Sequence, residues 1–156
     1  MAEIQIVPFR DDLAASFELL NREWIERLFK MEPTDLEMLR DPHVSILSKG
    51  GQIFFALDGT TPVGTVAAAR ESYRVFELAK MAVKPGYQGR GIGEQLGRAA
   101  IEYAHAQGAT MIYLETNSTL QNAVRLYERL GFVHATRPHP SEYERSNVYM
   151  ELHFRG

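Results

Sequence analysis

The fold of this chain is decided by one stretch, Phe76 to Arg98, which reads FELAKMAVKPGYQGRGIGEQLGR. Its first part, Phe76 to Val83, is a mostly apolar run of the length of a β-strand. Lys84-Pro85-Gly86 ends this run, because Pro lacks a backbone N–H donor and Gly tolerates unusual dihedral angles. From Ile92 onward, apolar residues recur at helical spacing. The stretch therefore predicts a strand, a glycine-containing loop and the start of a helix.

The loop between these two elements has the composition of an anion-binding site. Gly89, Gly91 and Gly93 carry no Cβ, so the backbone can turn in the left-handed region and approach a phosphate group closely. The N-terminus of a helix presents free N–H groups and partial positive charge at the same place. Arg90 adds a full positive charge. We therefore expect a phosphate cradle here.

Two common nucleotide-binding loops are excluded by the same residues. A P-loop needs a Lys-Ser/Thr pair after its last glycine, whereas Glu94 and Gln95 follow Gly93. The dinucleotide pattern G-x-G-x-x-G needs a third glycine where this chain has Leu96. The cradle must therefore serve a different phosphate ligand.

The loop resembles the Q-x-x-G-x-G pattern of the GNAT superfamily of acetyl-coenzyme A-dependent N-acetyltransferases, carried here by Gln88 to Gly93. A second segment, Ala123 to Phe132, is similar to the A-x-x-LYE-x-LGF signature of that family. The resemblance covers residues 51–132 well and the two ends loosely. It implies one GNAT-like acetyltransferase domain over residues 1–156, an α/β fold with a central mixed sheet of about six to seven strands flanked by about four helices.

The resemblance also implies which residues hold acetyl-coenzyme A. The loop would bind the pyrophosphate, and the backbone of the preceding strand would bind the pantetheine arm. Many members place an Asn against pantetheine where this chain has Leu120, so Asn117 and Asn122 are candidates to replace it. The residues assigned to coenzyme binding are Met81, Ala82, Val83, Gln88, Gly89, Arg90, Gly91, Ile92, Gly93, Glu94, Asn117 and Asn122.

Two residues are candidates for the chemistry. Glu77 lies in a strand whose faces are both largely apolar, and burying a charge is costly unless the charge is paired or functional. Several family members carry a general base at this place, and alternation would put Glu77 on the same face as Met81 and Val83. The alternative is a salt bridge, which is our interpretation of Lys80. In the family, the tyrosine that matches Tyr127 faces the coenzyme sulfur and can protonate the leaving thiolate; the alternative is a core tyrosine.

Elsewhere the patterns indicate ordinary structural roles. Trp24 lies on the apolar stripe of the first predicted helix and is interpreted as a core residue. The acidic residues between positions 32 and 41 are typical of a solvated face, although they also hint at an amine-bearing acceptor. Tyr143 and Arg145 fall in a loop near the acceptor side, and we expect this loop to be solvated.

Composition excludes several function classes. The chain has 156 residues, a net charge of −3 and no cysteine, which excludes disulfides and thiolate catalysis and argues against a nucleic-acid surface. Its five histidines are scattered, so no metal site is predicted. No secretion signal and no apolar run of membrane-spanning length is visible, so we expect no membrane partner and a cytoplasmic location; a homodimer is one assembly that the resemblance allows.

The function implied is direct transfer of an acetyl group from acetyl-coenzyme A to a primary amine of a small molecule or peptide. The alternative is a non-catalytic acyl-coenzyme A-binding or sensor module. The presence of both Glu77 and Tyr127 favours the enzyme, because a binding module needs neither.

Overall fold

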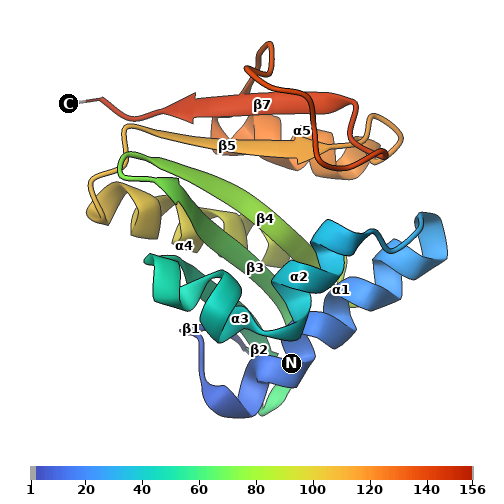
Figure 1. The fold of residues 1–156 in the computed structure, drawn as a ribbon. Helices are drawn as coiled ribbons and strands as arrows, with labels where there is room; N and C mark the ends of the chain where they lie inside the picture. Colours follow the sequence, from blue (N-terminus) through green and yellow to red (C-terminus); the bar gives the residue numbers. More distant parts are fainter. Residues whose placement is uncertain (1–2, 156) are drawn as a thin grey trace.

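The computed structural model describes residues 3–155 and contains one seven-stranded mixed sheet (Figure 1). The strands lie in the order β1-β2-β3-β4-β5-β7-β6, which confirms the predicted α/β fold. The strands are β1 (Ile4–Pro8), β2 (Gln52–Asp58), β3 (Thr61–Ser72), β4 (Val75–Val83), β5 (Met111–Thr116), β6 (Val133–His134) and β7 (Val148–His153).

Five α-helices lie in the described residues, rather than about four, because Pro42 opens one extra short turn of helix. They are α1 (Ala14–Leu28), α2 (Pro33–Arg40), α3 (Pro42–Ser45), α4 (Ile92–Ala106) and α5 (Gln121–Leu130), with short 3-10 helices η1 (Asp11–Leu13) and η2 (Leu47–Lys49). No helix within residues 3–155 is long and apolar enough to cross a membrane.

The connections follow from the strand order. Strands β1 to β4 pair antiparallel in sequence, and the crossover through α4 makes β5 parallel to β4. Strand β7 then pairs antiparallel with β5 on one side and with β6 on the other. The predicted strand–loop–helix unit is thus the centre of the molecule, and its β4 is the strand where the antiparallel half meets β5.

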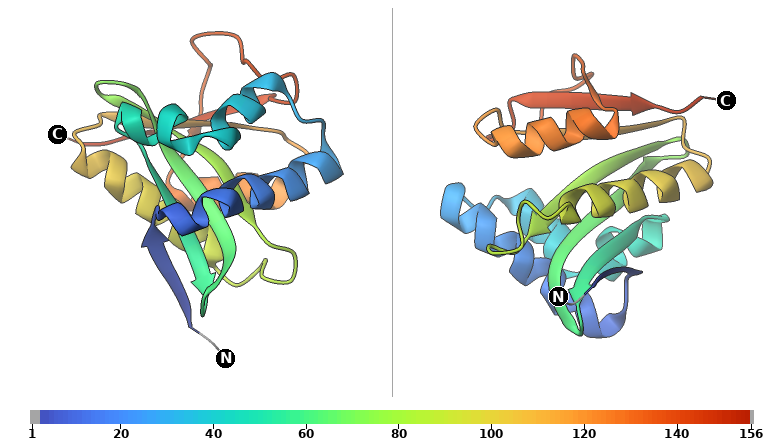
Figure 2. Two further views of the ribbon diagram at one scale, coloured as in Figure 1. Left: turned by 60° about the horizontal axis from the view of Figure 1, so that its bottom comes forward. Right: turned by 180° about the vertical axis from the view of Figure 1, so that it is seen from behind.

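Two apolar cores hold the helices against the two faces of the sheet. Helices α4 and α5 cover one face, and α1, α2 and α3 cover the other (Figure 2). The α4-side core includes Phe76, Leu78, Ile92, Leu96 and Leu114, and the α1-side core includes Phe17, Leu39, Ile53 and Phe55, all of them buried. Strand β4 is therefore covered on both faces, as its apolar composition predicts.

Strand β4 contains a bulge at Lys80, where φ is +55°. Pairing with β3 shifts at this point, so that residues 80 and 81 together oppose the single residue 66. Lys80 is the one non-glycine residue with positive φ among the described residues. This left-handed conformation costs a residue with a Cβ about 1–2 kcal/mol, so contacts elsewhere must hold it in place.

The bulge changes which side chains share a face. Leu78, Met81 and Val83 all pack in or against the α4-side core, whereas Lys80 reaches α2 on the other face. Glu77, which alternates with Leu78, also lies on the α2 face. The prediction that Glu77 shares a face with Met81 and Val83 is therefore wrong, because one inserted residue reverses the alternation beyond it.

Strands β4 and β5 are paired only at their N-terminal ends. Their pairing covers residues 75–77 of β4 and 111–113 of β5, after which the two strands separate. On its β5-facing edge, the second half of β4 therefore has no strand partner. This separation positions the candidate active site.

Candidate active site

A cavity lies where β4 and β5 separate, and we call it the β4–β5 cavity. Residues 77–83 of β4 and 115–117 at the end of β5 form two of its walls. Tyr127 of α5 and Trp24 of α1 close it from either side of the sheet, and Gln88 lies at the loop end. An elongated ligand can therefore run along the free edge of β4 from the glycine loop to Glu77.

The glycine loop has the backbone of an anion cradle. Gly89 and Gly91 both have φ of +78°, and Gly91 is the residue that precedes the first turn of the 15-residue α4. No atom lies within 4 Å of the position that a Cβ would occupy on either residue, so the space beside the backbone is open to a ligand. The free N–H groups and dipole of α4 converge on the same space. A pyrophosphate fits this arrangement.

The other residues of the loop contribute in different ways. Gln88 donates a side-chain hydrogen bond to the carbonyl of Val83 at 3.2 Å, which ties the loop to the end of β4. The Arg90 guanidinium lies 4.9 Å from the ring centre of Tyr87 and remains exposed to an incoming anion. Ile92 is buried in the core, and Glu94 forms ion pairs with arginines of α4 and α5, so for these two the coenzyme contact would come from the backbone.

Gly93 serves packing between helices. A Cβ on this residue would lie 2.9 Å from a methyl carbon of Leu126 and 3.7 Å from the sulfur of Met81. The glycine therefore lets α4 approach α5 and β4 closely. Our interpretation of Gly89 and Gly91 matches the backbone, whereas the reason for a glycine at position 93 differs from the one expected.

Glu77 lies at the inner end of the β4–β5 cavity and forms no ion pair with the described residues. Burial raises the pKa of its carboxyl to about 8, and the nearby Glu115 carboxylate adds to the increase while the Lys80 ammonium opposes it. A carboxyl group with a pKa near neutrality can accept a proton from an amine and release it to solvent.

Tyr127 projects from α5 into the same cavity. None of the hydrogen bonds among the described residues uses its hydroxyl group, and burial alone raises its pKa to about 12. The phenol therefore stays protonated over the physiological range and has a proton to donate. The centre of its ring lies 6.3 Å from that of Phe132 in an edge-to-face arrangement, so the ring packs against the α4-side core.

A second cavity, which we call the loop cavity, lies on the α2 face between α2, β5 and the loop of residues 137–143. Glu77, Glu115 and Tyr143 line both cavities, so Glu77 stands where the two meet. Glu115 is paired with Arg137 at 2.5 Å, whereas Glu37 and Glu142 form no ion pair with the described residues. The loop cavity therefore carries carboxylates that are available to a cationic ligand.

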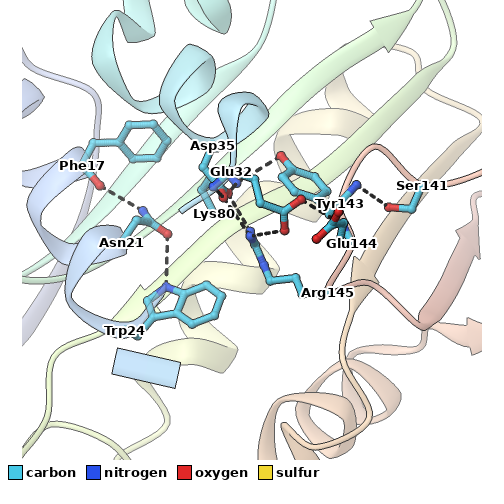
Figure 3. Close-up of polar contacts among 10 residues, drawn as sticks. All are labelled: Phe17, Asn21, Trp24, Glu32, Asp35, Lys80, Ser141, Tyr143, Glu144 and Arg145. Atoms are coloured by element: carbon cyan, nitrogen blue, oxygen red, sulfur yellow. Dashed lines mark hydrogen bonds and ion pairs between the residues drawn. The ribbon is translucent and has the colours of Figure 1, made fainter. Parts of the chain in front are cut away.

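A buried ion-pair network lies beside this junction (Figure 3). Asp35 of α2 is fully buried, and its carboxylate binds the Lys80 ammonium and also the Arg145 guanidinium through two contacts of 2.6 and 2.8 Å. Glu32 binds Arg145 as well, at 3.1 Å. The salt bridge predicted for Lys80 is confirmed, and its partner is Asp35.

With this geometry established, comparison with known proteins identifies the family. The model of the acetyltransferase (GNAT) family matches residues 13–132 of this chain. The chain belongs to this family. Acetyl-coenzyme A is the acetyl donor of GNAT enzymes, which agrees with a cradle that fits a pyrophosphate and an open strand edge beside it.

The relatives cover this GNAT chain to different extents. N-acetyltransferase 8B of Rattus norvegicus is 30% identical over 131 residues, which is 79% of this chain and 57% of the relative. N-acetylaspartate synthetase of Xenopus tropicalis is 42% identical over 73 residues, 46% of this chain and 27% of the relative. An uncharacterized N-acetyltransferase of Escherichia coli, YjgM, is 42% identical over 60 residues, 38% of this chain and 36% of the relative. The chain thus spans about a quarter to just over half of these relatives.

Solved structures show the same GNAT fold. An acetyltransferase of the GNAT family from Staphylococcus aureus Mu50 superimposes with a TM-score of 0.89 at 22% identity, over 98% of this chain and 100% of the other. The protein yncA from Salmonella typhimurium, solved with its cofactor acetyl-CoA, has a TM-score of 0.78 at 17% identity, over 99% of this chain and 96% of the other.

The two asparagines predicted to replace the pantetheine-contacting Asn differ in position. Asn122 is exposed on α5 and does not line the β4–β5 cavity. Asn117 does line it, but its amide already donates to the carbonyl of Arg145 at 2.6 Å and accepts from Thr119. Leu120, at the position where many members have the pantetheine-contacting Asn, lines the cavity as an apolar wall.

For other residues of this region, the surroundings predicted from the sequence are wrong. Trp24 is not a core residue: it is half-buried and lines the β4–β5 cavity, because the end of α1 extends past the sheet. Glu32 and Asp35 are not on a solvated face, and Arg145 is only 14% exposed. The one signal in the sequence was Lys80, a buried cation that needed a carboxylate, but nothing in the sequence indicated which of the four acidic residues would supply it.

Proposed function

We propose that this protein is an N-acetyltransferase that moves an acetyl group from acetyl-coenzyme A directly to a primary amine. The observation that carries the proposal is the position of Glu77, a carboxyl group with a raised pKa at the junction of two cavities. One cavity runs from it to Gln88, the residue next to the glycine cradle, and the other lies on the α2 face. A direct transfer needs this arrangement, because donor and acceptor must meet at one proton acceptor.

The donor side is supplied by the backbone of β4 and the start of α4. Gly89 and Gly91 would hold the pyrophosphate, with Arg90 adding charge. Residues 78–83 of β4 face the cavity along an edge that no neighbouring strand occupies, so their backbone groups can bind the amide groups of the pantetheine arm. The thioester supplies the acetyl group and a thiol of pKa about 8.5 as the leaving group.

The chemical roles of the side chains follow from their pKa values. An alkyl amine has a pKa of about 10.4 and must lose a proton before its nitrogen can attack the carbonyl carbon. Glu77 accepts that proton, directly or through water. As the carbon–sulfur bond breaks, the Tyr127 hydroxyl donates a hydrogen bond to the departing sulfur and passes its proton to it, and the phenolate then regains a proton from solvent. The backbone N–H groups of the β4 bulge stabilise the negative charge that develops on the carbonyl oxygen.

The acceptor enters through the loop cavity. A primary amine is cationic at neutral pH, and the carboxylates of Glu37 and Glu142 can pair with it directly, although Lys49 and Arg70 also line this cavity. The aromatic faces of Tyr113 and Tyr149, which stack at 5.7 Å on its wall, accommodate an apolar chain. Small-molecule amines and peptide amines both satisfy these requirements.

A thiol-release assay tests the proposal without background from the protein itself, because the chain contains no cysteine to react with the thiol reagent. Acetyl-coenzyme A would be incubated with panels of amines, polyamines, amino acids and peptides, and free coenzyme A would be measured. We expect amine-dependent release that falls strongly in Glu77→Gln. Calorimetric binding of acetyl-coenzyme A without turnover of any amine would instead identify an acyl-coenzyme A-binding module.

A further inference from the structure

The bulge of β4 combines a strained backbone with a buried charge at one residue, Lys80. Lys80 has φ of +55°, a conformation that glycine adopts freely and lysine does not. Its side chain is also buried, although lysine is among the residue types that are almost never fully buried unless their charge is paired. A strained backbone and a buried ammonium at the same residue indicate that the surroundings impose this conformation.

The surroundings of the ammonium group are fixed from several directions. Lys80 Nζ binds Asp35 Oδ1, donates to the Tyr143 hydroxyl at 3.1 Å and lies 4.6 Å from the centre of that ring. Asp35 in turn accepts from the backbone N–H of Glu32 at 2.9 Å and from the two terminal guanidinium nitrogens of Arg145. The carboxylate therefore cannot follow the lysine if the strand moves, because α2 and the 137–147 loop hold it on two sides.

We propose that Lys80 is a positioning residue, whose ammonium is clamped by Asp35 so that the left-handed bulge of β4 stays in place and keeps the strand edge open for the coenzyme. The bulge is where the face of β4 reverses, and it lies three residues beyond the last pair formed with β5. If β4 relaxed to a regular strand, Met81 would turn away from the α4 side and the backbone groups facing the β4–β5 cavity would change.

The same carboxylate also links the two sides of the site. Arg145 belongs to the β6–β7 loop, residues 135–147, whose residues 137–143 line the loop cavity, and its guanidinium lies 4.7 Å from the centre of the Tyr143 ring. Asp35 therefore connects the acceptor-side loop to the donor-side strand through one pair of oxygens. An ordinary buried ion pair would add only stability, whereas the proposed role predicts an effect that depends on the backbone conformation of residue 80.

Two substitutions at Lys80 separate a purely stabilising ion pair from the proposed positioning of the bulge. Both remove the ammonium group, but only one of them also removes the backbone strain. Lys80→Met keeps the length of the side chain, and Lys80→Gly adopts φ near +55° without a steric cost. In both variants Asp35 keeps Arg145 as its partner, so neither leaves the carboxylate unpaired. The measurements are the Kd of coenzyme A by calorimetry and the hydrogen–deuterium exchange of residues 78–83 in the free protein.

We expect Lys80→Met to weaken coenzyme A binding by about 5- to 30-fold, which corresponds to the free-energy cost of a left-handed backbone for a residue with a Cβ. Hydrogen–deuterium exchange at residues 78–83 should become faster. Lys80→Gly should bind coenzyme A with a Kd within about 5-fold of wild type. Glycine adopts the left-handed conformation without strain, so this variant loses only the ammonium group that restrains residue 80. Wild-type affinity and exchange in Lys80→Met would overturn the proposal, as would equal loss in both variants.

The inference on coenzyme binding rests on the proposed function, and the two can fail separately. If the wild-type protein did not bind coenzyme A, the proposed function would be wrong. The exchange comparison would still decide the role of Lys80: faster exchange at residues 78–83 in Lys80→Met than in Lys80→Gly supports the clamp, and equal rates overturn it.

Discussion

Glu77 and Met81 lie four residues apart in one strand, yet their side chains are on opposite faces of the sheet. Met81 packs against the α4-side core, and Glu77 faces α2 and the loop cavity. The bulge at Lys80 between them accounts for the reversal. Because of it, one strand presents the carboxyl that we propose as the proton acceptor to the loop cavity, while its following residues line the β4–β5 cavity.

Glu77→Gln should abolish the pH dependence of catalysis that this carboxyl sets. Because the pKa of Glu77 is raised to about 8, kcat/KM of the wild type should increase with pH up to about 8 and then level off. Glutamine cannot accept the proton, so this limb should disappear and kcat should fall by about 100-fold or more. A pH–rate profile measured with the best amine substrate checks both. An unchanged profile in the variant would contradict a role for Glu77 as base.

The same substitution predicts a stability change of defined sign. The folded-state pKa of about 8 lies above the ordinary value of 4.5, so the folded protein holds a proton that the unfolded chain releases between these two values. The contribution of this carboxyl to the free energy of unfolding is fully present below about pH 4.5 and is lost as pH rises through about 8. Glu77→Gln should therefore be more stable than wild type at pH 9 and similar to it at pH 4.5, as measured by urea unfolding.

Tyr127→Phe should reduce the rate without affecting coenzyme binding or stability. The hydroxyl is not used in the hydrogen bonds among the described residues, so its removal leaves no protein group unsatisfied. We expect kcat to fall by about 10- to 1,000-fold, the usual range for loss of general acid help, with Kd for coenzyme A unchanged. If the single-turnover rate constant of Tyr127→Phe equals that of wild type, Tyr127 serves only in packing.

Gly91→Asp should abolish coenzyme binding while the protein stays folded. A side chain at this residue would enter the space beside the start of α4, and its carboxylate would repel the pyrophosphate. Gly86→Asp is a matched control, because Gly86 also has a positive φ (+91°) and open space around it but lies before the cradle. Calorimetry should show loss of binding in the first variant only. Equal affinity in both would disprove the cradle.

Asp35→Asn should destabilise the protein by about 3–5 kcal/mol at pH 7, since two buried cations lose their shared carboxylate. Burial by itself raises the pKa of Asp35, but the hydrogen bonds from Arg145 and the charge of Lys80 outweigh it and lower the pKa to about 2. The stabilisation is thus present above pH 3.8 and is lost as pH falls through about 2.

Urea unfolding at pH 7 and at pH 2 measures this effect. The difference between Asp35→Asn and wild type should shrink at the lower pH. Glu37→Gln, on the same helix but exposed, should change stability by less than about 0.5 kcal/mol at either pH. A loss below about 1 kcal/mol in Asp35→Asn at pH 7 would contradict the clamp on Lys80.

The sequence by itself determined the central strand, the glycine cradle, the helix after it and the family, because each depends on local patterns. Gly89 and Gly91 are needed for their own φ angles, and the helix at Ile92 follows from its own apolar spacing. These causes act within a few residues along the chain, so the letters in one stretch are enough to predict them.

Only the tertiary structure decided the partner of Lys80, the face of Glu77 and the position of Trp24. Asp35 and Arg145 are separated from Lys80 by 45 and 65 residues in the chain and come together because α2 and the β6–β7 loop cover the same face of β4. The bulge at Lys80 exists because that remote carboxylate holds a strained backbone, and alternation along β4 carries no trace of it. Contacts between distant segments select these features, and no pattern in either segment records them.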